Sequence, residues 1–309
     1  MSRFIKSISV RDWGLEVSLG FINLHALHYL CAVTTKQRYF IKLAYDGTHY
    51  HGWQIQPNAV TVQEVLNEKL SIILRQPIET LGCGRTDTGV HATEFFAHFD
   101  VERKSIVDSP WTMDEKPDTT IDSNSNEATM DHRPWTMDFN QKIRSLNSIL
   151  PKDIAIKNIF PVAADAHARF DATLRSYEYH IHFNKDPFKN GYSWELRDRP
   201  DIELMNTAAS IMMEYTDFGC FSKSNTQVKT NICKINHARW EVAGDSIVFK
   251  ISADRFLRNM VRAIVGTLLM VGKHEIEPEA VRTIIESKNR SNAGTSVPAC
   301  GLYLTEVLY

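Results

Sequence analysis

The residues best suited to chemistry lie in one glycine-rich stretch, 81–92 (LGCGRTDTGVHA), which holds Arg85, Asp87 and His91. Glycine adopts backbone angles that other residues resist, so the chain can turn sharply here. An Asp in such a loop, two residues from a cation, can act as a nucleophile, as a general base or as a residue that hydrogen-bonds its own turn. No second carboxylate lies within three residues, and no His-x-x-His or Cys-x-x-Cys pair accompanies Asp87, so neither a local acid–base pair nor a metal site is indicated.

Strands are predicted on both sides of this loop. The apolar run 78–81 leads into it, and the aromatic-rich run 94–101 follows it. Asp87 is therefore expected on a tight loop between two strands, a common place for functional residues on a rigid scaffold. Further strands are predicted at 38–45 and 302–309, the last in a central position because it is apolar throughout. A helix is expected after Thr61, with Glu64 completing a capping box.

A further strand is predicted at 175–183, where alternation places Arg175, Tyr177 and Tyr179 on one face. A tyrosine near a catalytic loop can stack on a base while its hydroxyl makes a hydrogen bond. The alternative is a tyrosine of the core, and the pattern alone favours that alternative.

Three arginines, Arg255, Arg258 and Arg262, are spaced i, i+3 and i+7, which predicts one edge of a helix. Such an edge suits phosphates, a buried carboxylate or plain solvation. Arg262 lies deepest in the apolar stretch and is the one expected to be buried and paired.

Several motifs, in this order, resemble the tRNA pseudouridine synthase A family. They are 44–48 (AYDGT) with 51–54 (HGWQ), 84–92 (GRTDTGVHA), 167–173 (HARFDAT) followed by Arg175, Tyr177 and Tyr179, 260–262 (MVR) with 264–266 (IVG), and 301–304 (GLYL). The similarity runs from about residue 38 to residue 309, apart from one insertion. Cys83 departs from the family, which usually has Ala there.

The irregular alternation of helices and strands predicts an α+β fold with a mainly antiparallel sheet. The resemblance implies the pseudouridine synthase fold, in which two related α/β halves share that sheet around a central basic cleft. We expect an N-terminal catalytic half at 38–150, with an acidic low-complexity insertion at about 102–137, and a C-terminal half at 151–309. Residues 1–37 are expected to be an N-terminal extension of unknown status.

The resemblance also implies the activity. It is the cofactor-independent isomerisation of uridine to pseudouridine in the tRNA anticodon stem-loop, at positions 38, 39 and 40, with no metal. By this resemblance Asp87 is the nucleophile, Arg262 its partner, and Tyr177 the residue that stacks on the uracil. The expected substrate-binding residues are Tyr177, Arg85, Arg255, Arg258 and Arg169. A homodimer is implied as well.

Composition is that of a globular protein, and its charge distribution permits the binding of a polyanion without demonstrating it. The net charge is −2, but residues 105–138 carry eight acidic and two basic side chains, or −6, which leaves +4 on the rest. Within this segment the pentapeptide PWTMD occurs at 110–114 and again at 134–138, as in a local duplication of a surface loop. Five scattered cysteines suit reduced thiols in the cytoplasm. No stretch of ~20 apolar residues indicates a membrane span.

Two other functions are compatible with the same residues. One is a catalytically silent RNA-binding module in which Asp87 is structural. The other is a metal-dependent phosphoesterase that uses Asp46, His49, Asp87 and His91.

Overall fold

The computed structural model describes residues 29–109, 139–223 and 230–309, and for 29–34 and 103–109 it describes the backbone alone. Its strands are β1 (Tyr29–Tyr45), β2 (Leu81–Gly82), β3 (His91–Ser109), β4 (Ile154–Pro161), β5 (Leu174–His182), β6 (Trp194–Glu195), β7 (Ile235–Ala243), β8 (Ser246–Ala253) and β9 (Leu302–Leu308). Its α-helices are α1 (Val62–Leu74), α2 (Phe139–Ile149), α3 (Ile202–Met212), α4 (Met260–Gly272) and α5 (Ala280–Glu286), with short 3₁₀ turns at Gly219–Phe221, Arg290–Asn292 and Ala299–Gly301.

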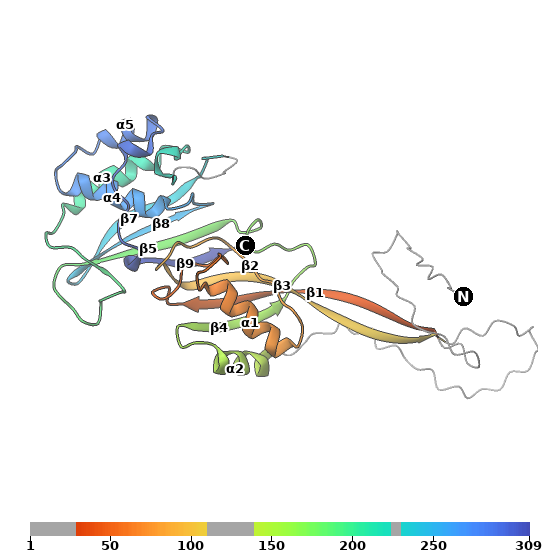
Figure 1. Cartoon of the computed structure of the whole chain (residues 1–309). Helices are drawn as coiled ribbons and strands as arrows, with labels where there is room; N and C mark the ends of the chain where they lie inside the picture. Colours follow the sequence, from red (N-terminus) through yellow and green to blue (C-terminus); the bar gives the residue numbers. More distant parts are fainter. Residues whose placement is uncertain (1–28, 110–138, 224–229) are drawn as a thin grey trace, which may run out of the picture.

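The described strands form one sheet in the order β4-β1-β3-β9-β5-β8-β7, with β2 on β3 and β6 on β5 (Figure 1). All of these pairings are antiparallel except β3–β9 and β5–β6. The predicted α+β class with a mainly antiparallel sheet is therefore confirmed. The C-terminal strand β9 lies between β3 and β5, in the central position expected of an apolar strand.

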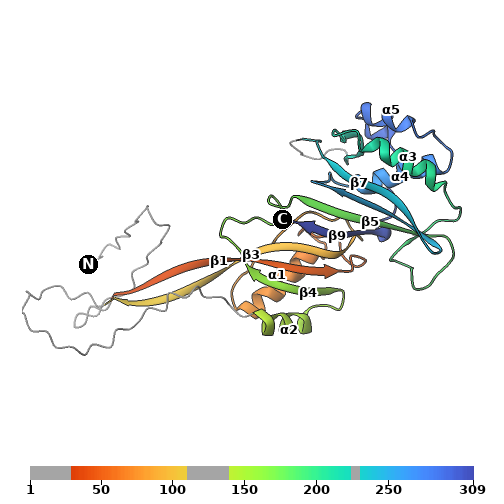
Figure 2. The same ribbon diagram turned by 180° about the vertical axis from the view of Figure 1, so that it is seen from behind.

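The helices pack in two groups against this sheet. Figure 2 shows α1 and α2 beside β1, β3 and β4, and α3, α4 and α5 beside β7 and β8. One hydrophobic core contains α1, α2 and strands β1, β3 and β4, and the other contains α3, α4, α5 and strands β7 and β8. Strand β9 contributes to both cores, through Leu302 to one and through Leu304 and Val307 to the other. The partly buried Tyr177 of β5 also packs against both cores.

Three predicted boundaries were wrong. Strand β1 begins at Tyr29 rather than at residue 38, because its first residues pair with the far end of β3, Tyr29 with Ser109. The two strands project from the body of the molecule as a ribbon (Figure 1). The first part of the predicted insertion is accordingly strand, whereas 110–138, with its repeated pentapeptide, lies outside the described residues. The strand expected at 78–81 is only the two residues Leu81–Gly82.

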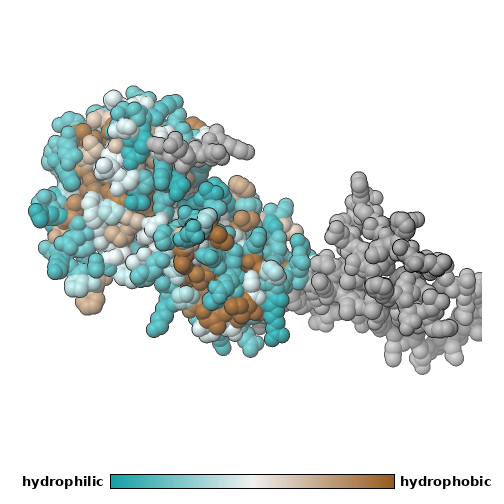
Figure 3. Space-filling view, viewed as in Figure 1, coloured by the Kyte–Doolittle hydropathy of each residue, from teal (hydrophilic) through white to brown (hydrophobic). Residues whose placement is uncertain are grey.

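The surface seen in Figure 3 is mostly hydrophilic, with an apolar area over the body that carries α1, α2 and β4. Ile72 of α1 and Ile149 of α2 are among the exposed large apolar side chains. Among the helices of the described ranges, none combines the length and the apolar character that crossing a membrane requires.

Candidate active site

The loop that carries Asp87 connects β2 to β3, as predicted, and it is fixed by backbone hydrogen bonds. The amide of Cys83 donates to the carbonyl of Phe96 (2.7 Å), and the amide of Val90 donates to the carbonyl of Asp87 (3.2 Å). The Thr86 and Tyr45 hydroxyls are 2.9 Å apart in the interior. Several contacts therefore fix the backbone on both sides of Asp87.

Two buried aromatic side chains pack beneath this loop. Trp53 and Phe95 are buried and stacked with ring centroids 4.1 Å apart. A Cβ atom at Gly82 would lie 2.5 Å from the indole nitrogen of Trp53, which is closer than side chains approach one another. Glycine is required at this position because the chain passes directly over the indole ring.

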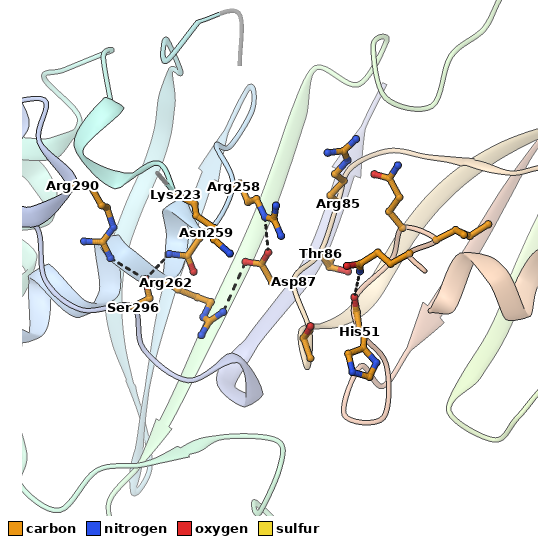
Figure 4. A pocket seen from close by; sticks show the side chains of 14 residues that line it. His51, Arg85, Thr86, Asp87, Lys223, Arg258, Asn259, Arg262, Arg290 and Ser296 are labelled. Carbon is orange, nitrogen blue, oxygen red and sulfur yellow. Dashed lines mark hydrogen bonds and ion pairs between the residues drawn. The ribbon is translucent and has the colours of Figure 1, made fainter. Parts of the chain in front are cut away.

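Two arginines face the carboxylate of Asp87 (Figure 4). The Arg258 Nε lies 3.5 Å from Oδ1, and the Arg262 Nη1 lies 3.9 Å from Oδ2. A second contact fixes the orientation of the Arg262 guanidinium, because its Nε donates to the carbonyl of Val297 at 2.7 Å. The side chains of Asp87 and Arg262 are 24% and 20% exposed, whereas Arg258 is 51% exposed. The pair with Arg262 is thus the better shielded of the two.

The helical edge predicted for the three arginines was wrong. Helix α4 begins only at Met260, after Asn259, whose φ of 64° lies in the left-handed region and interrupts the helix. Arg262 is in the first turn of α4, but Arg255 and Arg258 precede the helix. Arg258 reaches Asp87 from the turn before the helix rather than from a helical face.

The carboxylate opens into a pocket of about 890 Å³. The residues around it are His51, Gln54, Ile55, Gln56, Arg85, Thr86, Asp87, Thr88, Lys223, Arg258, Asn259, Arg262, Arg290 and Ser296. Five of these side chains are cationic and only Asp87 is anionic. The lining comes from the Asp87 loop and the 51–56 loop on one side and from the α4 start and the 290–296 segment on the other (Figure 4). The charge of the pocket is therefore complementary to an anionic ligand.

Of the predicted substrate-binding arginines, Arg85 and Arg258 line the pocket, while Arg169 and Arg255 do not. Burial lowers the pKa of Arg169, and the positive charges of Arg85, Arg175 and Arg255 lower it further, so Arg169 lies near the pocket-lining Arg85. The sequence analysis did not single out Arg290 or Ser296, because the segment that carries them has no recognisable motif.

Tyr177 is partly buried between the two cores and is not among the residues that line the pocket. Its ring meets that of Phe256 edge to face, with centroids 5.1 Å apart. Burial raises the pKa of Tyr177, and the charges of Cys83 and Asp87 raise it further, which places the phenol near the carboxylate and keeps it protonated at neutral pH. Tyr179, expected in the core, is fully buried and donates to the carbonyl of Pro298 (2.8 Å).

The four residues of the phosphoesterase alternative do not form one site. His91 is buried 3.0 Å from Asp46 and also contacts the Gly191 carbonyl, while the side chain of His49 is exposed. Asp87 faces arginines instead. In the part of the chain that the structure describes, no three His, Cys, Asp or Glu side chains are grouped so that they could hold a metal ion.

Comparison with known proteins gives the family. Residues 215–309 match the family model described as tRNA pseudouridine synthase. The tRNA pseudouridine synthase A of Parabacteroides distasonis is 46% identical over 273 residues, which cover 88% of this chain and 96% of that protein. The protein of the same name from Bacteroides thetaiotaomicron is 47% identical over 276 residues, covering 88% and 91%. The tRNA pseudouridine synthase A 2 of Clostridium perfringens is 35% identical over 271 residues, covering 87% and 98%. The chain therefore belongs to the tRNA pseudouridine synthase A family, a family of isomerases.

Proposed function

We propose that this enzyme isomerises uridine to pseudouridine in tRNA, with Asp87 as the nucleophile. The observation that carries the proposal is a single carboxylate, held between Arg258 and Arg262, in a pocket whose other charged side chains are all cationic. Such a pocket attracts the phosphates of RNA and offers one group able to attack. By the resemblance, the uridines lie at positions 38, 39 and 40 of the anticodon stem-loop.

The reaction moves one bond and needs no net oxidation or reduction. The glycosidic bond from N1 of uracil to C1′ of the ribose breaks, the base rotates, and a bond from C5 to C1′ forms. The proton on C5 is lost and N1 gains one, so atoms balance without a cofactor. Asp87 attacks either the sugar or the base. Arg258 and Arg262 face both of its oxygens and so hold the carboxylate in the orientation that attack requires.

Tyr177 acts through its ring and its neutral hydroxyl. Because its pKa is raised, the phenol is a hydrogen-bond donor near Asp87 and a poor base at neutral pH. The ring, fixed against Phe256, supports the uracil by stacking.

The remaining cations bind and hold the RNA. Arg85, exposed at the pocket edge, fills the space that the flipped nucleotide leaves and so offsets the cost of unstacking. Arg258 at the pocket wall and Arg169 and Arg255 beside it contact the phosphate backbone.

The pocket is the basic cleft between two related halves. The two hydrophobic cores support a division into halves. Strand β4, which a boundary at residue 150 would assign to the C-terminal half, packs in the first core with residues 38–150, so the N-terminal half extends at least through β4. We further propose a homodimer that works in the cytoplasm, which the resemblance supports.

Tritium release from tRNA transcripts labelled at C5 of uridine tests the proposal. Wild type and Asp87→Asn are compared in EDTA, and the product is mapped by position. We expect release by wild type alone, with pseudouridine at positions 38 to 40. Binding without release by wild type would favour the silent RNA-binding module, and activity that EDTA abolishes would favour the metal-dependent class.

A further inference from the structure

The loop 166–171 presents an aromatic ring to solvent from a fixed backbone. Phe170 is 75% exposed. Hydrogen bonds fix the backbone just before it: the Ala168 amide donates to the buried His98 (3.1 Å), and the Ala168 carbonyl accepts from the Tyr309 hydroxyl (2.7 Å). Arg175 donates to the Arg169 carbonyl at 2.6 Å. The loop is therefore anchored to the body while its largest apolar side chain stays outside.

The ring of Phe170 is also braced from one side. Its centroid lies 4.2 Å from that of His167, with 36° between the planes. His167 in turn meets the buried His98 edge to face at 4.6 Å. A short column of rings therefore runs from the interior to the surface and ends in Phe170. Because the ring is already held in place, stacking on it loses little side-chain entropy.

One cation lies beside this ring, and further arginines lie near that cation. The guanidinium of Arg169 lies 5.8 Å from the Phe170 centroid. The positive charges of Arg85 and Arg255 help to lower the pKa of Arg169, so the three repel one another. Among the side chains that the structure describes, none within 4 Å forms an ion pair with any of these three arginines. Arg85 also lines the pocket, so this arginine cluster continues the pocket surface.

We propose that Phe170 is a stacking platform for an unpaired base of the RNA, and that Arg169 and Arg255 bind the phosphates beside that base. The inference rests on the proposed function, because it extends the same RNA path beyond the Asp87 pocket. Anions would relieve the repulsion among the arginines, and an exposed ring beside a cation matches single-stranded RNA, whose bases are flat and whose backbone is anionic. Neither feature contributes to the core.

Binding of a full-length tRNA transcript tests the proposal, with Phe170→Ala, Phe170→Trp and Arg169→Gln measured from 50 to 200 mM salt. The matched control is Phe188→Ala, since Phe188 is 92% exposed and lies outside the pocket lining. We expect Phe170→Ala to weaken binding on the order of 10-fold with an unchanged salt slope, since stacking is not ionic. Phe170→Trp restores affinity, and its added fluorescence is quenched by the RNA. Arg169→Gln lowers the salt slope by about one.

The proposal is overturned if Phe170→Ala binds tRNA as tightly as Phe188→Ala does, or if Phe170→Trp neither rescues affinity nor reports RNA by quenching. The two proposals fail separately. If the wild type isomerises uridine and Phe170→Ala binds tRNA as tightly as the wild type does, the proposed function stands and the stacking platform is rejected. If the wild type releases no tritium but its binding of RNA is weakened by Phe170→Ala, the stacking platform stands and the isomerase function is rejected. Thermal melts show whether each variant is folded.

Discussion

We expect the two arginines at Asp87 to make different contributions, with the longer contact the more important one. Arg258 is nearer at 3.5 Å but half-exposed, whereas Arg262 at 3.9 Å is 20% exposed and braced by the Val297 carbonyl. Breaking a shielded charge pair from one side costs about 3–5 kcal/mol, while an exposed pair contributes about 0.2–1 kcal/mol. We take the lower end, about 3 kcal/mol, for Arg262 because Asp87 retains some solvent contact.

The lost contact is one that holds Asp87 in position in the transition state, so we apply the same free energies to the barrier, where each 1.36 kcal/mol is about tenfold in rate. Arg262→Gln is expected to slow single-turnover tritium release on the order of 100-fold, and Arg258→Gln at most about fivefold. Enzyme is used in excess over labelled tRNA, so that weaker binding does not enter the rate. Arg199→Gln is the control, since Arg199 forms an exposed pair with Asp245 (2.9 Å) and lies outside the pocket lining. The reasoning is refuted if Arg258→Gln is as slow as Arg262→Gln, or if folded Arg262→Gln stays within fivefold of wild type.

Three other predictions concern residues outside the contacts between Asp87 and its arginines. Gly82→Ala should destabilise the fold by about 1–3 kcal/mol, because its Cβ would meet the Trp53 indole, while Gly84→Ala, which meets open space, should change stability by less than about 0.5 kcal/mol; urea unfolding distinguishes them. Burial lowers the pKa of His98 to about 4 in the folded protein. As the pH falls, His98 is therefore protonated in the unfolded chain before it is protonated in the folded one, so the free energy of unfolding decreases between about pH 6.5 and pH 4. The loss between pH 7 and pH 5 should be about 2 kcal/mol, and His98→Gln should remove it in pH-dependent urea titrations. Tyr177→Phe should slow tritium release less than about tenfold, because a protonated phenol is not the general base. A loss of about 10²–10⁴-fold, the usual effect of removing a general base, would contradict this assignment.

Local patterns predicted several elements well because each depends on residues close in sequence. The helix that begins after Thr61 is α1, and the Thr61 side chain accepts from the Glu64 amide at 3.4 Å, as the capping signal indicated. The loop between two strands was predicted from glycines beside apolar runs. Strand β9 was placed centrally because it was judged apolar throughout, and it does lie between β3 and β5, although it contains Thr305 and Glu306.

Other features depended on contacts between distant residues. The start of α4 follows Asn259, whose side-chain amide donates to the hydroxyl of Ser296, 37 residues away. No periodicity in 255–262 reports that contact, so the spacing of the arginines predicted a helix that begins too early. The first residues of β1 were missed in the same way, since their partners in β3 lie beyond residue 100.

The sequence by itself determined the family resemblance, the class of fold and the loop that presents Asp87, because those depend on residue types and short spacings. Only the tertiary structure showed that a second cation, besides the Arg262 that the resemblance implied, meets that carboxylate. It brought Arg258 to Asp87 from a turn, added Arg290 to the pocket, and left Arg169 beside it next to an exposed ring. The physical reason is that a charged site is assembled across the sheet, where its geometry depends on how the two cores pack and not on the order of residues along the chain.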